Sequence, residues 1–200
     1  MTIIFGTLLL AALLGFLAGG RLSNLAQLRI RWLPAAMLGL ALQLAPVSGG
    51  DRPLLLLYVS FILLASFAVA NLRDGIPGAA LILVGILMNF TVIAVNEGMP
   101  VTRDALVRSG QMSTLEFLVE EGGAKHHLAG PQDDLLFLGD VIPIGPPIRQ
   151  AISLGDVFTY GGVVWLIVVG MLRRPVTSSA GSRPIEMELL AVPREGSGVG

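Results

Sequence analysis

The chain has 200 residues, of which 54% are hydrophobic and 14% are charged, and its formal net charge is −1. Soluble domains carry about 25% charged residues, so this composition excludes a disordered protein and a typical cytosolic enzyme. The near-zero net charge gives no electrostatic basis for nucleic acid as a partner.

Residue types that often carry chemistry are scarce. Cysteine is absent, which excludes disulfides, thiolate metal sites and cysteine nucleophiles. The two histidines, His126 and His127, are adjacent in a polar segment, so a haem held by histidines on apolar helices is excluded as well. Lys125 is the only lysine, and no Gly-rich phosphate loop surrounds it. These residues identify no cofactor.

Five apolar stretches are at or near the length of about 20 residues that a helix needs to cross a bilayer. They are residues 2–20, 33–47, 54–70, 76–95 and 153–172. In hydrocarbon each is expected to be helical, because a helix satisfies its own backbone hydrogen bonds. We therefore predict an all-α, polytopic membrane bundle of about five transmembrane helices. The stretch 33–47 is short, and a re-entrant segment that leaves four crossings is the alternative.

The arginines predict the orientation of this bundle. Residues 2–20 lack the basic start and the cleavage site of a signal peptide, so this stretch is expected to stay as a helix. Five crossings place most arginines of the short connections on one side, which the positive-inside rule makes cytoplasmic. They are Arg21, Arg29, Arg31, Arg73, Arg173 and Arg174. The N-terminus is then outside and the C-terminus is cytoplasmic.

The chain is expected to divide into a membrane bundle, residues 1–172, and a tail, residues 173–200. The tail is rich in Ser, Gly and Pro and is predicted to be disordered and cytoplasmic. Within the bundle, residues 96–152 form a long polar loop that this topology places outside. A loop of this length is more often functional than a mere connector.

The loop is expected to contain two short helices. Thr102 can cap a helix that runs to about Ser109. A Ser113–Glu116 capping box predicts a second helix that ends at Gly122–Gly123. Apolar residues of the second helix are expected to form one side that could lie on the membrane surface. They are Leu115, Phe117, Leu118 and Val119.

Small residues recur at helical spacing in three of the apolar stretches, which predicts close packing between helices. They are Ala11, Gly15 and Gly19, then Ala35 and Gly39, and then Gly78 and Gly85. Gln43 and Asn89 continue two of these stripes. We interpret them as structural polar groups that hydrogen-bond between helices, and a pore or substrate site is the alternative.

Three groups of short motifs differ from ordinary loop sequence. They are Asn96-Glu97-Gly98-Met99-Pro100-Val101, then Lys125-His126-His127 with Leu138-Gly139-Asp140-Val141-Ile142-Pro143, and then Ser153-Leu154-Gly155-Asp156. With these motifs in this order, residues 1–172 resemble a family of bacterial multi-pass membrane proteins, common in actinobacteria, that is known only as a domain of unknown function. The resemblance implies the membrane architecture and a place in the bacterial plasma membrane, and it implies no reaction.

The motifs also supply the candidate site. Candidate residues for binding a ligand or partner are Asn96, Lys125, His126, Asp140 and Asp156. Ser153 and Asp156 have the spacing of a capping box, which needs no ligand. His126 and His127 are not expected to hold one ion together, because adjacent side chains diverge. One histidine with Asp140 and Asp156 could instead form a metal site or an acid–base group.

We expect a non-enzymatic accessory or binding subunit whose outer loop recognises a partner protein, a lipid headgroup or a small ligand. Its expected partners are the lipid bilayer and a membrane protein. The alternative is a membrane-embedded enzyme that acts on a lipid or envelope precursor through His126 with Asp140 or Asp156. A small channel or carrier is the third reading, although no ionisable residue lies in the middle of an apolar stretch, as coupled transport usually requires.

Overall fold

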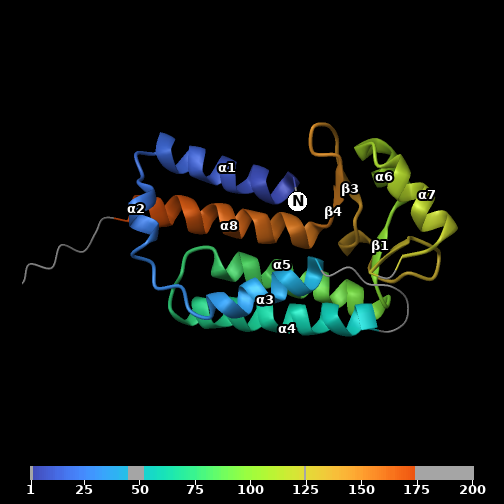
Figure 1. Ribbon diagram of the computed structural model, residues 1–200, viewed down its shortest axis with the longest axis horizontal. Helices are drawn as coiled ribbons and strands as arrows, with labels where there is room; N and C mark the ends of the chain where they lie inside the picture. The colour runs from blue at the N-terminus through green and yellow to red at the C-terminus, as the bar shows by residue number, and fades with distance from the viewer. Residues whose placement is uncertain (1, 45–51, 124, 174–200) are drawn as a thin grey trace, which may run out of the picture.

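The computed structural model describes residues 2–44, 52–123 and 125–173. Five long helices run side by side along the long axis of the molecule, and a small cap of short helices and strands covers one end (Figure 1). The long helices are α1 (Thr2–Leu17), α3 (Leu33–Leu44), α4 (Arg52–Arg73), α5 (Ala79–Val95) and α8 (Leu154–Leu172). The four-residue α2 (Leu22–Leu25) lies at the end away from the cap. Each predicted apolar stretch therefore contains one helix.

The helix ends differ from the predicted ones for local reasons. α5 begins at Ala79 and not at Ile76, because Pro77 cannot donate a hydrogen bond and Gly78 has a left-handed φ of 78°. α4 continues past the predicted residue 70 to Arg73. The last part of the stretch 33–47, together with the predicted tail from residue 174 onward, lies outside the described residues.

Two of the described helices are long and apolar enough to cross a membrane. They are the segment Leu54–Arg73 of α4, with 20 residues, and α8, with 19 residues. α1, α3 and α5 are apolar but shorter, with 16, 12 and 17 residues. At 1.5 Å per residue, α4 is about 33 Å long and α1 about 24 Å, against a hydrocarbon core of about 30 Å.

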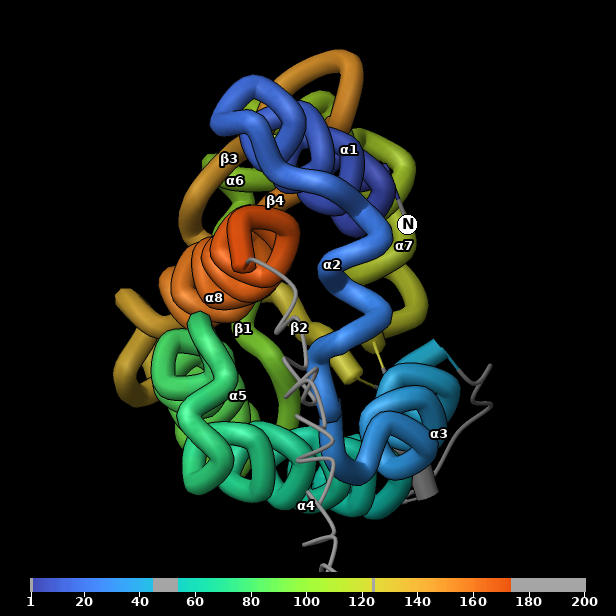
Figure 2. The backbone as a smooth tube through the Cα atoms, turned by 90° about the vertical axis from the view of Figure 1, so that its left-hand side faces the viewer, coloured from blue at the N-terminus to red at the C-terminus, as the bar shows by residue number. Residues whose placement is uncertain are grey.

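Viewed along their axes, the long helices form an arc with α1 and α3 at its two ends (Figure 2). α1 packs on α8, α8 on α5, α5 on α4, and α4 on α3. The start of α1, the end of α3, the start of α4, the end of α5 and the start of α8 all lie at the cap end (Figure 1). The connections that contain Arg21, Arg29, Arg31 and Arg73 therefore share the opposite end.

Glycines allow the helices to approach one another closely, as the small-residue stripes predict. A Cβ atom at Gly85 of α5 would collide with the backbone of Gly155 in α8. Further along the same pair, a Cβ atom at Gly162 would lie 2.7 Å from Ile82 Cγ1 and 2.8 Å from the Gly78 carbonyl oxygen. Backbones this close leave no room for side chains, so the α5–α8 contact requires glycine at these positions.

The distribution of polarity across the bundle is the reverse of that in a soluble protein. Large apolar side chains face outward, including Phe5 (69% exposed), Leu9 (73%) and Leu55 (62%). Ser60 and Asn71, by contrast, are buried between helices and hydrogen-bonded: the Ser60 hydroxyl donates to the Gly39 carbonyl over 2.8 Å. Such a continuous apolar exterior is rare on soluble proteins.

The cap, residues 99–152, contains strands as well as helices. β1 (Met99–Val101) pairs in parallel with β2 (His126–Leu128), and β3 (Ile142–Ile144) pairs antiparallel with β4 (Gln150–Ile152). Between them lie α6 (Arg103–Ser109), α7 (Met112–Glu120) and the 3₁₀ turn η1 (Leu136–Leu138). The molecule is therefore mostly helical, and the prediction of short helices alone for this loop was incomplete.

The two predicted caps in this region have different outcomes. Thr102 does cap α6, since its hydroxyl accepts a hydrogen bond from the Ala105 N–H over 3.3 Å. The Ser113–Glu116 capping box is wrong. α7 begins at Met112 after Gln111, whose carbonyl already accepts the Leu115 N–H over 3.0 Å, so Ser113 lies inside the first turn.

The predicted single apolar side of α7 is also wrong. Leu115 and Leu118 are buried in a small core of the cap, whereas Phe117 and Val119 are 49% and 55% exposed. The helix therefore has one apolar face turned into the cap and apolar residues on its outer surface as well.

A neighbouring pair of glycines tests the α5–α8 contact. Gly162→Ala should destabilise the protein by about 1–3 kcal/mol, because the new methyl group overpacks a tight interface. Gly161→Ala is the matched control, because nothing lies within 4 Å of a Cβ there and alanine favours helix. Thermal unfolding of the purified protein in a neutral detergent measures both. Equal unfolding temperatures for the two variants would contradict this packing.

Candidate functional site

A partly open cavity of about 640 Å³ lies between the cap and the start of α1. Its polar lining consists of Thr2, Gln111, Thr114, Lys125, His126, Asp140, Arg149 and Gln150. Its apolar lining includes Leu106, Phe117, Leu118 and Ile148. A cavity of this size that combines polar groups with apolar surface is typical of small-ligand binding.

Asp140 is the buried carboxyl group of this cavity, and backbone pairing fixes its position. Its N–H donates to the Pro100 carbonyl over 2.9 Å, and its own carbonyl accepts the Thr102 N–H over 3.2 Å. These bonds form a bridge beside β1. Burial, with the nearby Asp156 carboxyl group, raises the pKa of Asp140 well above 3.8. The group therefore keeps its proton to a higher pH than an exposed aspartate.

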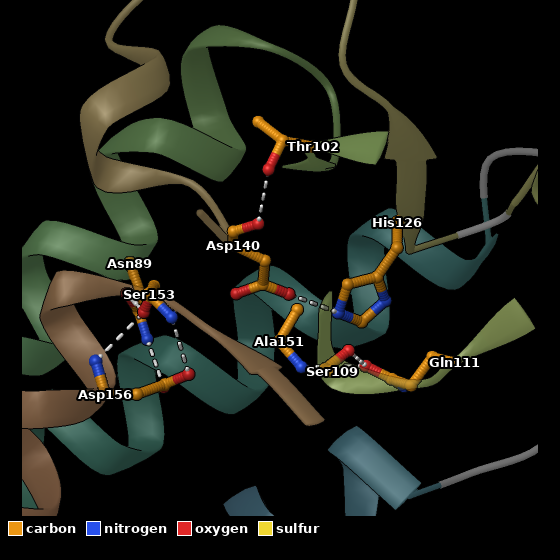
Figure 3. Close-up of polar contacts among 9 residues, drawn as sticks. All are labelled: Asn89, Thr102, Ser109, Gln111, His126, Asp140, Ala151, Ser153 and Asp156. Atoms are coloured by element: carbon orange, nitrogen blue, oxygen red, sulfur yellow. Dashed lines mark hydrogen bonds and ion pairs between the residues drawn. The ribbon is translucent and has the colours of Figure 1, made fainter. Parts of the chain in front are cut away.

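His126 and Asp140 both line the cavity and face each other, with 3.7 Å between His126 Nε2 and an Asp140 carboxylate oxygen (Figure 3). Surrounding protein atoms, with Lys125 and His127, lower the pKa of His126 below 6.5. Its side chain is 52% exposed, so water limits this shift. His126 is thus biased towards its neutral form and Asp140 towards its protonated form, which lessens the charge of the pair.

Asp156 does not line the cavity. It belongs to a polar network beneath Asp140, where α5 meets the start of α8 (Figure 3). The Asn89 amide donates to Asp156 over 2.8 Å, and the Ser153 hydroxyl donates to the Asn89 oxygen over 2.7 Å. Ser153 and Asp156 also form the predicted capping box of α8. Asn89 thus makes hydrogen bonds between helices, the role suggested by its place in the stripe.

Lys125 connects the cap to the end of α3. Its ammonium group donates to the Gln43 carbonyl over 2.8 Å. A cation near the last carbonyls of a helix is favourable, because these groups carry partial negative charge. Gln43 therefore contributes through its backbone in this contact. Burial lowers the pKa of Lys125 from 10.5.

Asn96 and His127 belong to a second, structural cluster outside the cavity. The Asn96 amide donates to the Asp134 carbonyl over 2.9 Å, and its oxygen accepts the Asp134 N–H over 2.8 Å. His127 contacts Asp133 over 2.9 Å, and Asp133 also accepts the Gly130 N–H over 2.7 Å. The two histidines thus have different partners, as their adjacency predicts. These contacts fix the loop that leads to η1 and Asp140.

Arg149 and Gln111 are cavity residues that the sequence motifs do not include. Gln111 is held in place, because its side-chain oxygen accepts the Ala151 N–H over 2.7 Å and a hydroxyl hydrogen bond from Ser109 over 3.1 Å. Arg149 lies in the β3–β4 hairpin with a left-handed φ of 51°. A positive φ is uncommon for arginine. Arg149 reaches the cavity because the β3–β4 hairpin folds back onto the cap.

Of the five candidate residues, the cavity therefore unites Lys125, His126 and Asp140. Asp156 lies behind them, and Asn96 belongs to the loop cluster. Among the residues that the structure describes, no group of three or more His, Cys, Asp or Glu side chains could hold a metal ion. One histidine with Asp140 and Asp156, the metal site considered from the sequence, therefore does not form such a group in the described residues.

A family of unknown function, DUF5317, matches residues 27–168. The chain belongs to this family. The DUF5317 match covers the whole cap and helices α3, α4 and α5 with most of α8, and it begins after α1. Neither a curated protein nor a solved structure was found to match the chain.

The raised pKa of Asp140 predicts a pH dependence of stability in this DUF5317 protein. In the folded state Asp140 keeps its proton above pH 3.8, whereas in the unfolded chain it loses the proton near that pH. The unfolded state is therefore favoured by loss of this proton, and the free energy of unfolding falls as the pH rises. Asp140→Asn should remove this cost, and its unfolding temperature should exceed that of the wild type by a margin that grows from pH 4 to pH 8. Glu116→Gln, an exposed change on α7, is the control. A margin that shrinks with pH would contradict the buried, protonated state.

Proposed function

We propose that this protein is a multi-pass membrane protein that binds a small ligand in the cap cavity. The observation that carries the proposal is the cavity itself, which combines about 640 Å³ of space with cationic, hydrogen-bonding and apolar walls. It lies where the cap meets the ends of the long helices. In this reading the protein acts as an accessory or binding subunit, and the cap is its recognition surface.

The apolar exterior of the helices supports a membrane location. Leucine and phenylalanine side chains on α1, α3 and α4 face outward, and the described helices α4 and α8 are long enough to cross a bilayer. All five long helices run along one axis, so α1, α3 and α5 lie at the same depth as the two longer ones. Five crossings are part of the proposal.

The positions of charged residues support the orientation. Arg21, Arg29, Arg31 and Arg73 belong to connections at the end away from the cap. The positive-inside rule makes that end cytoplasmic and the cap extracytoplasmic. We propose the same orientation for a bacterial plasma membrane, with the N-terminus outside and the C-terminus inside.

The contact between His126 and Asp140 supports a second candidate function, an enzyme that acts on the bound molecule. Carboxyl and imidazole groups with shifted pKa values beside a cavity are typical of acid–base catalysis. In this case Asp140 in its protonated form is the acid and neutral His126 is the base. Asp140→Asn would then abolish turnover while ligand binding persists, whereas a binding subunit would show no turnover at all.

Reporter fusions test the membrane part of the proposal. A phosphatase inserted near Gly123 in the cap should be active outside the cell, and a fluorescent protein fused after Gly200 should fluoresce in the cytoplasm. We expect the protein to fractionate with membranes and to be released from them only by detergent. The reverse reporter pattern would overturn the orientation, and a detergent-free monodisperse protein would overturn the membrane location.

Native mass spectrometry tests the binding part. We expect the full-length protein, purified in a mild neutral detergent, to retain a bound small molecule. Thr114→Phe places a large side chain on the cavity wall and should remove this adduct. Ser113→Phe, the adjacent exposed position on α7, is the matched control and should retain it. No adduct, or an adduct that survives Thr114→Phe, would refute the proposed cavity function.

A further inference from the structure

The charge of the cavity is positive although the whole chain has a net charge of −1. The cavity lining contains the cationic side chains Lys125 and Arg149 and one carboxyl group, Asp140. The two cationic side chains outnumber this single carboxyl group, whose pKa burial raises. A ligand that enters the cavity therefore meets two cations, and anionic groups on that ligand are favoured.

Arg149 has the geometry of a recognition residue. Its side-chain carbons would lie 3.9 to 4.0 Å from a Cβ at Gly110, so its stem extends along the turn between α6 and α7. Within the described residues no carboxylate lies within ion-pair distance of its guanidinium group. A guanidinium group matches phosphate and carboxylate oxygens with two parallel hydrogen bonds.

The cavity also has an apolar wall that a free inorganic anion would not use. Phe117 is 49% exposed and lines the cavity together with Ile148 from the β3–β4 hairpin. Leu106 and Leu118 also line the cavity and belong to the buried core of the cap. A ligand with an apolar part beside its charged group would cover this surface and gain about 25 cal/mol per Å² of apolar area.

The position of the cavity connects it to the proposed bilayer. Thr2 at the start of α1 lines it, and Lys125 at its edge binds the end of α3 through the Gln43 carbonyl. α1 and α3 are the two ends of the helix arc (Figure 2). The cavity is therefore at the level of the helix ends, where lipid headgroups lie, on the side where the arc is open.

We propose that the cavity binds an anionic lipid, with the head group against Arg149 and Lys125 and the start of the acyl chain against Phe117 and Ile148. This inference rests on the proposed membrane-bound binding function and specifies its ligand class. An amphiphile with one phosphate group and one chain fits these features, because its phosphate would contact the two cations and its chain the apolar wall, at the level of the membrane surface.

Three probes that differ in head-group charge or in the presence of an acyl chain test this ligand class. The full-length protein in neutral detergent is titrated with 1-oleoyl lysophosphatidate, with 1-oleoyl lysophosphatidylcholine and with inorganic phosphate, and binding is read by native mass spectrometry. The lysophosphatidate should bind at least about tenfold more tightly than the choline lipid, which is the effect of roughly one charge-assisted hydrogen bond. Inorganic phosphate should bind far more weakly, because it lacks the chain.

Arginine variants locate the binding. Arg149→Gln should weaken lysophosphatidate binding about tenfold and should weaken binding of the choline lipid, whose head group has no net charge, by a smaller factor. Arg103→Gln is the matched control: Arg103 is exposed on α6 of the same cap and does not line the cavity, so both lipids should bind as in the wild type.

The other outcomes separate this inference from the proposed function. Equal binding of both lipids would show a site that does not select the net negative head group, and phosphate binding as tightly as the lipid would show a site for free anions; either result overturns the anionic-lipid proposal. An unchanged affinity in Arg149→Gln overturns it too. If neither lipid binds but the purified adduct is still lost in Thr114→Phe, the lipid proposal fails and the binding function stands.

Discussion

The close approach of α5 and α8 determines where every part of the cap lies. β1 begins four residues after α5 ends, and β4 ends two residues before α8 begins. Glycine contacts fix the separation of the two helices, and Asn89 fixes their register through Ser153 and Asp156. Because both attachments of the cap start from this pair, a shift between α5 and α8 would move β1 relative to β4. The cavity above them depends on the same contact.

The electrostatics of the site follow from this arrangement. Asp140 lies beside β1 and above the start of α8, close enough to Asp156 for the two carboxyl groups to disfavour ionising together. The Asn89 amide and the capping box stabilise charge on Asp156 and offer none of their hydrogen bonds to Asp140. The two aspartates therefore have different environments although they lie close together, and only Asp140 lines the cavity.

Much of this architecture could be predicted from the sequence, for identifiable reasons. The five apolar stretches and the glycine spacing depend on local composition, and each produced a helix or a helix contact. The capping box of α8 was predictable because Ser153 and Asp156 have its spacing and α8 begins directly after Ser153. Ser113 and Glu116 have the same spacing, yet the helix starts before them because the Gln111 carbonyl accepts the Leu115 N–H.

The parts that could not be predicted depend on contacts distant in sequence. The strands have three residues each, too few for an alternating pattern, and pair over separations of up to 27 residues. Arg149 reaches the cavity because it lies in the β3–β4 hairpin, and Gln111 is held there by the Ala151 N–H. The motifs did indicate Lys125, His126 and Asp140, but the sequence offered no means to separate these cavity residues from Asn96, which holds a loop.

The end of the bundle away from the cap satisfies its backbone groups with protein rather than with solvent. The Met171 carbonyl in the last turn of α8 accepts two hydrogen bonds, from the Arg21 N–H over 2.9 Å and from the Asn24 amide over 2.7 Å. The Asn71 side chain pairs with both the N–H and the carbonyl of Arg31. These contacts satisfy backbone groups between the helices, while the exposed side chains of Arg21, Arg29, Arg31 and Arg73 keep this end of the proposed bundle in the hydrated headgroup layer. The turns at this end are thereby tied to α8 and α4, so the helices themselves set where these arginines lie relative to the bilayer surface.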